Sequence, residues 1–240
     1  MGRVLITGAN RGLGLEFVRQ CLERGDHVFA ACRRPDEATD LHELARLVPE
    51  RTTILPLDVT DDDSIVEAWR TISARVDGLD LLVNNAGIYR RDDMHDADAD
   101  HPDRYIDREI MAQTWDANVT GPLRVAQQFV DLLRRGDKPR IVSLSSLMGS
   151  IERKAGAGAY SYSASKAALN MVMHLFSFEV AADGVVCVVM SPGWVKTDMG
   201  GAGASLTPEH SVRTMLAAIR ALGPRDNGRF LDRDGSPLPW

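Results

Sequence analysis

The chain has 240 residues, of which 44% are hydrophobic and 26% are charged, a composition typical of a globular protein with a sizeable core. The formal net charge of −6 argues against a nucleic-acid-binding protein, whose phosphate-facing surface needs an excess of Lys and Arg. Three widely separated cysteines, Cys21, Cys32 and Cys187, form no C-x-x-C pair, which indicates a reduced compartment and no zinc knuckle.

The amino terminus runs directly into the apolar segment RVLIT, with no secretory signal pattern ahead of it. No apolar run approaches the roughly 18 residues that a membrane span requires. We therefore expect a soluble, cytoplasmic protein that contacts neither membranes nor nucleic acid.

Short apolar runs alternate with longer segments of helical period along the whole chain. Several runs are rich in β-branched residues and apolar almost throughout, as expected for strands that are covered on both faces. The pattern predicts one domain over 1–240 with a doubly wound α/β fold, in which helices cover both faces of a seven-stranded parallel sheet. The expected strands are residues 3–7, 27–32, 53–57, 79–84, 140–145, 185–190 and, more weakly, 228–231.

The segment 90–102, RRDDMHDADADHP, contains five aspartates and two histidines but has no periodicity. Regular ligand spacing is absent, and the segment lies where a loop between a strand and a helix is expected. We predict a solvated acidic loop and no metal site.

A glycine-rich turn, ITGANRGLGLE, joins the first expected strand to the first expected helix. Gly8, Gly12 and Gly14 let the backbone turn sharply and approach a pyrophosphate, while the helix N-terminus offers free N–H groups. A purely structural turn would also use glycines, but the position of this one in the doubly wound pattern favours a dinucleotide site. The intervening residues Asn10, Arg11 and Leu13 are then candidate cofactor contacts.

Arginines at the end of the second expected strand indicate which dinucleotide is bound. An NAD site usually has an acidic residue there for the ribose 2′-hydroxyl, whereas Arg favours a 2′-phosphate. Arg33 and Arg34 occupy this region, and Arg11 lies inside the glycine turn. These residues could be ordinary solvated arginines, but guanidinium groups suit phosphate contacts, and we predict NADP(H).

Two tyrosines and a lysine occur close together in the segment GAYSYSASKAALN. On a helix, residues four apart share a face, whereas residues six apart lie about 120° apart around the axis. Tyr162, and not Tyr160, can therefore lie beside Lys166. A neighbouring positive charge lowers the pKa of a phenol, which makes Tyr162 a candidate general acid or base.

With these motifs the chain resembles the short-chain dehydrogenase/reductase family, and the match extends over about residues 3–200. The motifs follow the order of that family: T-G-x-x-x-G-x-G at 7–14, LDV at 57–59, NNAG at 84–87, ANVTGP at 117–122, IVSLSS at 141–146, YSASK at 162–166 and SPGWVKTDM at 191–199. Further pieces, including MGSI and PGWVKTDMGG, are similar to its sniffer/C-factor branch, which is related to carbonyl reductases.

This resemblance implies a Rossmann fold and a catalytic tetrad of Asn118, Ser146, Tyr162 and Lys166. Tyr162 would protonate a carbonyl oxygen, Ser146 would hydrogen-bond to that oxygen, Lys166 would lower the pKa of Tyr162 and bind ribose hydroxyls, and Asn118 would hold a relay water. The other implied cofactor contacts are Asp58, Val59, Asn85, Ala86, Gly87, Pro192, Gly193, Val195 and Thr197. A structural role is the less favoured alternative for Asn84 and for the Pro192-Gly193 pair.

Two departures from the family pattern concern the catalytic serine. Ser146 and Tyr162 are sixteen residues apart, more than is usual in that family, so the intervening loop is lengthened. Ser145 and Ser146 are adjacent, and neighbouring strand residues point to opposite faces, so only one of them can face the site. We choose Ser146 and keep Ser145 as the alternative.

The segment 194–207, rich in Gly and small residues, is expected to be a flexible substrate loop, followed by a helix that Thr207 caps and Pro208 begins. It could close as a lid or simply connect two elements. We expect Ser146 at the substrate, with Met148, Tyr160, Trp194 and Met199 as an apolar pocket wall. No basic cluster in the sequence marks the substrate as strongly anionic.

The sequence thus predicts an NADPH-dependent oxidoreductase that reduces an aldehyde, ketone or quinone. The alternative is a nucleotide-binding signalling protein similar to C-factor with little turnover. The resemblance also implies a homodimer or homotetramer built on helices around 105–135 and 160–181.

Overall fold

The computed structural model describes residues 2–90 and 106–240. Apart from Arg90, the acidic segment 90–102 lies outside these residues, and its expected role as a solvated loop stays a prediction.

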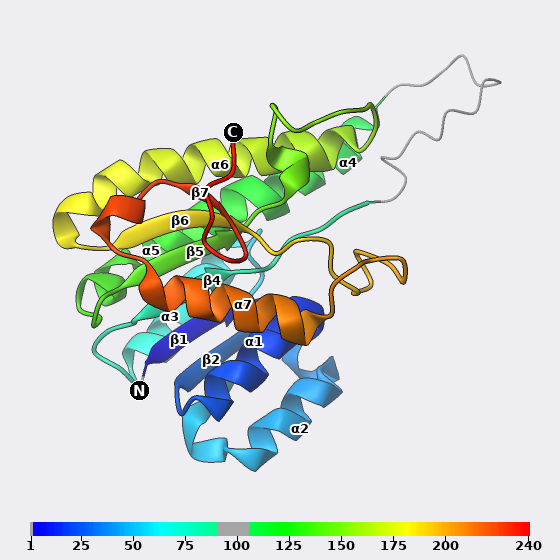
Figure 1. Cartoon of the computed structure of the whole chain (residues 1–240). Coiled ribbons are helices and arrows are strands. Elements are labelled where there is room, and N and C mark those ends of the chain that lie inside the picture. Colours follow the sequence, from blue (N-terminus) through cyan, green and yellow to red (C-terminus); the bar gives the residue numbers. More distant parts are fainter. Residues whose placement is uncertain (1, 91–105) are drawn as a thin grey trace.

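Seven parallel strands form one sheet in the order β3-β2-β1-β4-β5-β6-β7 (Figure 1). This confirms the predicted doubly wound fold, with strand boundaries shifted by no more than a few residues. The strands are β1 (Arg3–Thr7), β2 (His27–Cys32), β3 (Thr52–Pro56), β4 (Leu81–Asn84), β5 (Arg140–Leu144), β6 (Val186–Ser191) and β7 (Phe230–Asp232).

Helices cover both faces of the sheet, and each face has its own apolar core (Figure 1). One core packs α3 (Asp62–Ser73), α5 (Gly121–Arg134) and α6 (Tyr160–Val180) against the sheet. The other packs α1 (Gly12–Glu23), α2 (Thr39–Leu47) and α7 (Pro208–Ala221). Because successive side chains of a strand enter opposite cores, the strands must be apolar at nearly every position.

The helix starts follow their local sequence. The carboxylate of Asp61 accepts hydrogen bonds from the backbone N–H groups of Asp63 and Ser64, which caps α3. Thr207 caps α7 by accepting from the N–H of His210, with Pro208 at the first helical position as predicted. Both caps satisfy backbone donors that no helical carbonyl can reach.

The predicted long helix around 105–135 is instead divided into three parts. α4 (Arg108–Trp115) passes into a π-helical turn (η4, Asp116–Thr120), and α5 follows. Pro122 has no N–H with which to bond to the carbonyl four residues earlier, so an unbroken α-helix cannot be completed here. At Gly121 an added β-carbon would lie 2.7 Å from the backbone oxygen of Val59, so the wider turn also brings two chain segments into close contact.

The strand order reverses between β1 and β4, which are neighbours at the centre of the sheet. From β1 the chain adds β2 and β3 on one side, and from β4 it adds β5, β6 and β7 on the other. In open parallel sheets, ligands bind at the carboxyl ends of the strands beside such a reversal. The remaining short helices are η1 (Pro35–Glu37), η2 (Pro49–Arg51), η5 (Leu147–Gly149), η6 (Ala181–Asp183) and η7 (Pro224–Asp226). None of the helices in the described ranges has the length and apolar character of a membrane span.

Candidate active site

The glycine turn between β1 and α1 leaves room for a ligand at the helix N-terminus. Gly8 and Gly12 have positive φ values of 64° and 55°, and a β-carbon on Gly14 would lie 2.1 Å from the backbone oxygen of Gly8. Residue Arg11 precedes α1, and its side chain accepts no hydrogen bond from the first N–H groups of the helix. These groups and the close backbone fit the pyrophosphate of a dinucleotide.

Neighbouring elements hold this turn in place. The side-chain amide of Asn85 donates to the backbone oxygens of Thr7 and Gly8 at 2.8 and 3.0 Å. The hydroxyl of Thr7 accepts from the backbone N–H groups of Asn85 and Ala86. The amide of Asn85 therefore positions the cofactor turn, a role more indirect than the contact that the resemblance implied.

A cleft of about 410 Å³ extends from the turn along the ends of β1, β2 and β4. Arg11 and Arg33 line it, whereas Arg34 forms an exposed ion pair with Glu37 at 3.0 Å. Arg11 is itself paired with Asp198 at 2.8 Å, across the mouth of the cleft. The other lining residues are Thr60, Gly87, Ile88, Tyr89, Arg90, Gln113, Asp116, Ala117, Asp198 and Met199.

The remaining expected cofactor residues surround this cleft less directly. Asp58 accepts hydrogen bonds from the N–H and hydroxyl of Thr60, and Val59 is buried beside Gly121. Thr197 lies near the glycine turn, because a β-carbon on Gly12 would be 3.4 Å from its methyl group. Asn10, Leu13, Pro192 and Gly193 are half-buried, and Val195 is buried. Asn84 is buried, and its side-chain amide donates to the carbonyl of Pro122 and to the hydroxyl of Ser143. These contacts agree with the structural role that was the alternative for this residue.

Tyr162 and Lys166 lie together on the buried side of α6, as the four-residue spacing predicted. The ammonium nitrogen of Lys166 is 5.8 Å from the centre of the Tyr162 ring and donates to the backbone oxygen of Leu144 at 2.8 Å. Tyr160, at the first position of α6, is 46% exposed. The helix geometry thus brings one of the two tyrosines to the lysine and turns the other outward.

Burial sets the protonation states of this pair. Burial raises the pKa of Tyr162 to about 12, although a hydrogen bond with Ser146 acts in the opposite direction and Tyr89 adds to the rise. Burial lowers the pKa of Lys166 to about 8. The pKa of Tyr162 is thus raised by burial, so the expected lowering by Lys166 is wrong for the protein without cofactor. In this state Tyr162 is protonated at neutral pH, as a proton donor must be.

The structure separates the two adjacent serines. The Ser145 hydroxyl is buried and donates to Asn170 Oδ1 at 2.6 Å, away from Tyr162. The Ser146 hydroxyl, at the end of β5, accepts from the N–H of Met148 and is the one that hydrogen-bonds with Tyr162. The geometry favours Ser146 over Ser145 as the substrate-facing hydroxyl.

Asn118, buried in the π-helical turn, connects β4 with α6. Its side chain accepts from the N–H of Ile88 at 2.8 Å and donates to the carbonyl of Ile88 and to the Ser165 hydroxyl. The Ser165 hydroxyl donates to the carbonyl of Tyr162. A β-carbon on Gly87 would lie 3.0 Å from Asn118 Oδ1 and 3.7 Å from Lys166 Nζ, so glycine keeps this space open.

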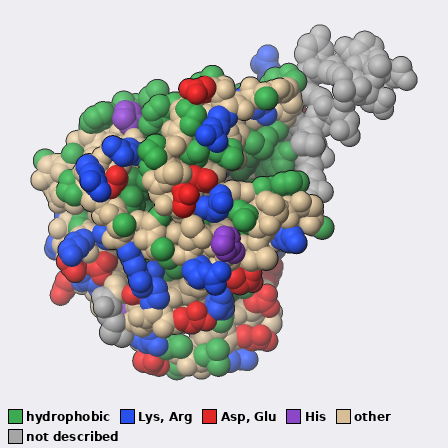
Figure 2. Space-filling view, in the orientation of Figure 1, with side chains coloured by type: hydrophobic (Ala, Val, Ile, Leu, Met, Phe, Trp, Pro, Cys, Tyr) green, Lys and Arg blue, Asp and Glu red, His purple; other side chains and the backbone are tan. Residues whose placement is uncertain are grey.

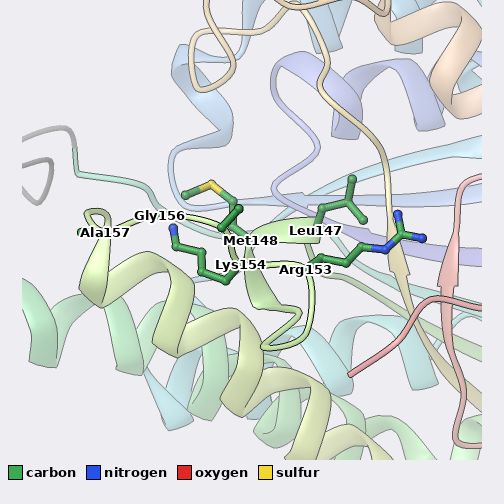
Figure 3. Close-up of a pocket in the computed structure, with 7 residues that line it drawn as sticks. Leu147, Met148, Arg153, Lys154, Gly156 and Ala157 are labelled. Atoms are coloured by element: carbon green, nitrogen blue, oxygen red, sulfur yellow. The ribbon is translucent and has the colours of Figure 1, made fainter.

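A second cavity, of about 340 Å³, lies within the lengthened loop after Ser146 (Figure 3). Met148 lines it as expected, but Trp194, Tyr160 and Met199 do not, and the expected apolar wall does not form. Trp194 is 58% exposed and its indole N–H donates to Gly200, while Met199 lines the cofactor cleft. The cavity is lined by Leu147, Met148, Arg153, Lys154, Ala155, Gly156 and Ala157.

Backbone hydrogen bonds close the base of the segment 194–207. Lys196 donates to the carbonyl of Leu206, and Leu206 donates to that of Trp194. Whether this segment closes over substrate stays a prediction.

Sequence reasoning missed Tyr89, whose ring centre is 4.7 Å from that of Tyr162. Its position just after NNAG, beyond the carboxyl end of β4, was the available signal, because ligands bind at these strand ends. It also missed Arg153 and Lys154, which lie in an exposed loop without periodicity. In the described part of the chain, no three His, Cys, Asp or Glu side chains gather as a metal site would require.

Comparison with known proteins places the chain in a family. A sequence model described as short chain dehydrogenase matches residues 3–205. The structure of the carbonyl reductase Sniffer of D. melanogaster has a TM-score of 0.91 and 32% identity, with 100% of both chains covered. An NADPH-bound carbonyl reductase from chicken fatty liver has a TM-score of 0.90 and 36% identity, with 100% of this chain and 94% of that chain covered.

The C-signal protein of Myxococcus xanthus is 41% identical over 162 residues, which cover 68% of this chain and 93% of that protein. These likenesses confirm the resemblance to the sniffer/C-factor branch. Together with the seven-stranded fold and the extent of the family match, they show that the chain belongs to the short-chain dehydrogenase family of oxidoreductases.

Proposed function

We propose that this NADP(H)-dependent oxidoreductase reduces the carbonyl group of an aldehyde, ketone or quinone to an alcohol. The observation that carries the proposal is the pairing of the Tyr162 and Ser146 hydroxyls beside the buried ammonium of Lys166, next to the cofactor cleft. The names of two similar structures, both carbonyl reductases and one NADPH-bound, support it.

The residues present fit the cofactor. The N–H groups at the start of α1 would hold the pyrophosphate, and Arg33, with Arg11, would face the 2′-phosphate. Gly87 leaves space beside Asn118 and Lys166 for the nicotinamide-ribose end. Pro192, Gly193, Val195 and Thr197 would follow that end, as the resemblance implies.

When bound, NADPH supplies a hydride to the carbonyl carbon of the substrate. Ser146 donates a hydrogen bond to the carbonyl oxygen and stabilises the negative charge that develops there. Tyr162 gives its phenolic proton to the same oxygen, and the O–H bond of the alcohol forms as the O–H bond of the phenol breaks. One carbonyl, one NADPH and one proton become one alcohol and one NADP⁺.

Lys166 stabilises the phenolate left on Tyr162, because its ammonium lies close to the ring in the same buried site. We assign to Asn118 the positioning of the relay that returns a proton to this pair. Its side chain joins Ile88 to Ser165, which in turn contacts the carbonyl of Tyr162.

Two matched variants test the proposal. Purified protein is mixed with NADPH or NADH and a panel of aldehydes, ketones, diketones and quinones, and cofactor oxidation is followed. Tyr162→Phe is expected to lower kcat by at least about a hundredfold, the range for loss of a general acid. Tyr160→Phe, on the exposed side of the same helix, should leave kcat close to the wild-type value.

If Tyr160→Phe were the inactive variant, the assignment of Tyr162 would be wrong. If NADPH binds tightly and no carbonyl is reduced, the signalling alternative replaces this proposal. If the reaction were as fast with NADH as with NADPH, Arg11 and Arg33 would have no role in recognising the 2′-phosphate.

We further propose that the protein acts as a homodimer or homotetramer in the cytoplasm. Met171, Leu175 and Phe178 are exposed on one stripe of α6. Apolar side chains are also visible along the edge of the molecule where α6 lies (Figure 2). All three cysteines are buried and free, which fits a reducing compartment. Sedimentation that shows a monomer at micromolar concentration would exclude the oligomer.

A further inference from the structure

The lengthened loop between Ser146 and Tyr162 forms the substrate-side cavity and carries two cationic side chains, Arg153 and Lys154 (Figure 3). Among the described residues no acidic side chain lines this cavity, although the whole chain has a net charge of −6. The lining of this cavity is therefore positively charged, against the overall charge of the protein, and the charged ends of Arg153 and Lys154 point toward opposite sides of it (Figure 3).

The position of the cavity is defined by contacts at both of its sides. Leu147 and Met148 directly follow Ser146, and the N–H of Met148 donates to the Ser146 hydroxyl at 3.1 Å. On the other side, the ammonium of Lys154 donates to the hydroxyl of Ser163, the neighbour of Tyr162, at 3.2 Å. The cavity thus begins where the proposed reaction takes place.

Neither cation has a counter-ion among the described residues. Lys154 donates only to neutral acceptors, the Ser163 hydroxyl and the carbonyl of Gly158, which leaves one of its three protons available. The guanidinium of Arg153 forms no ion pair with any residue in the described ranges, including Glu152, which directly precedes it in the sequence. Two unpaired cations beside apolar Leu147 and Met148 suit a molecule with an apolar body and an anionic end.

We propose that this cavity binds a carboxylate on the carbonyl substrate, so that the preferred substrates are aldehydes or ketones with a carboxylate some distance from the reacting carbon. Arg153 and Lys154 determine this specificity and take no part in the chemistry. The inference rests on the proposed reductase function and adds the substrate class.

The test compares acids with their neutral methyl esters under NADPH. The two pairs are 4-formylbenzoate with its ester, and 4-(4-formylphenyl)butanoate with its ester, which differ in the reach of the carboxylate. We expect kcat/KM to favour the acid by about tenfold in at least one pair, as two partly exposed charge contacts of a few-fold each would give. The preference should fall as salt is added, because exposed charges are screened.

The double variant Arg153→Met with Lys154→Met should abolish the preference, because kcat/KM falls further for the acids than for the esters. A control double variant, Arg46→Met with Arg225→Met, removes two exposed charges from α2 and η7, outside both the cavity and the cleft, and should keep the preference. NADPH binding, followed by its fluorescence, should be the same in all proteins.

If the esters are reduced but the acid is preferred in neither pair, the inference is overturned and the reductase function is upheld. A preference that survives in the Arg153/Lys154 variant also overturns it. If neither acids, esters nor any other carbonyl is reduced, the proposed function fails first, and the inference fails with it.

Discussion

The cofactor side and the substrate side of the site are built in different ways. On the cofactor side, backbone groups and glycines define the shape, and buried amides such as Asn85 hold them in place. On the substrate side, the cavity lies in an exposed loop, and Gly156, the glycine among its lining residues, has nothing within 4 Å of an added β-carbon. A cofactor of constant shape suits a rigid backbone cradle, whereas loops can change their side chains without disturbing the sheet.

The largest expected difference is between two glycine-to-alanine variants, one on the cofactor side and one on the substrate side. In Gly14→Ala, the new carbon would lie 2.1 Å from Gly8 O and 2.6 Å from Asn85 Nδ2, so the turn must move. We expect a loss of at least about 3 kcal/mol in the free energy of unfolding, together with at least about a tenfold weaker affinity for NADPH. Urea unfolding and NADPH fluorescence titration measure the two effects.

Gly156→Ala is the matched change on the substrate side. It should alter the free energy of unfolding by no more than about 0.5 kcal/mol, because it meets open space and its φ is not positive. Equal losses in the two variants would contradict the contrast between the two sides.

The second prediction concerns Lys166, where function works against stability. Its pKa falls from the usual 10.5 to about 8 because of burial, and each unit corresponds to about 1.4 kcal/mol. Keeping the ammonium charged in the folded protein at pH 7 therefore costs about 3 kcal/mol, partly offset by its bond to Leu144 O. Lys166→Met should raise the free energy of unfolding at pH 7 by about 2 kcal/mol while activity is lost.

The stabilisation expected in Lys166→Met should depend on pH, because Lys166 releases its proton at different pH values in the folded and unfolded protein. Between the folded pKa near 8 and the unfolded value near 10.5, the unfolded wild type binds more protons, so its stability rises with pH. The advantage of Lys166→Met should be complete below pH 8 and shrink toward pH 10. An advantage that stays constant over this range would refute the burial argument.

The smallest effect is expected at an exposed ion pair between two residues that line the cofactor cleft. Asp198, from the segment after β6, pairs with Arg11 of the glycine turn, and both side chains are well exposed. Asp198→Asn should leave stability within about 1 kcal/mol, as for other surface ion pairs, and should tighten NADPH binding a few-fold by releasing Arg11. Wild type and Asp198→Asn are titrated with NADPH and with NADH, which has no 2′-phosphate. If the affinity for both cofactors rose equally, the release of Arg11 toward the 2′-phosphate would be excluded as the cause.

Much of this site could be predicted because it depends on local periodicity. Short runs that are apolar almost throughout, together with the intervening helical segments, determined the seven-stranded sheet, and the glycine turn after its first strand located the cofactor cleft. A four-residue helical spacing was sufficient to choose Tyr162 over Tyr160. These features follow from positions close in sequence, where backbone geometry alone decides which side chains share a face.

Other features depended on contacts between distant segments. The choice of Ser146 over Ser145 required Asn170, twenty-five residues away from Ser145, to accept the competing hydroxyl. The π-helical turn that aims Asn118 at Ile88 and Ser165 was predicted as ordinary helix. Tyr89 was found only through its ring contact with Tyr162.

The sequence by itself therefore determined the fold, the cofactor cleft and the tyrosine–lysine pair, because each is written in short-range patterns of apolar, glycine and helical positions. Only the tertiary structure decided which serine faces the site and which side chains line the substrate cavity. Arg153 and Lys154 occur in an exposed loop without periodicity, and their position beside Ser146 and Ser163 exists only once β5 and α6 have packed together.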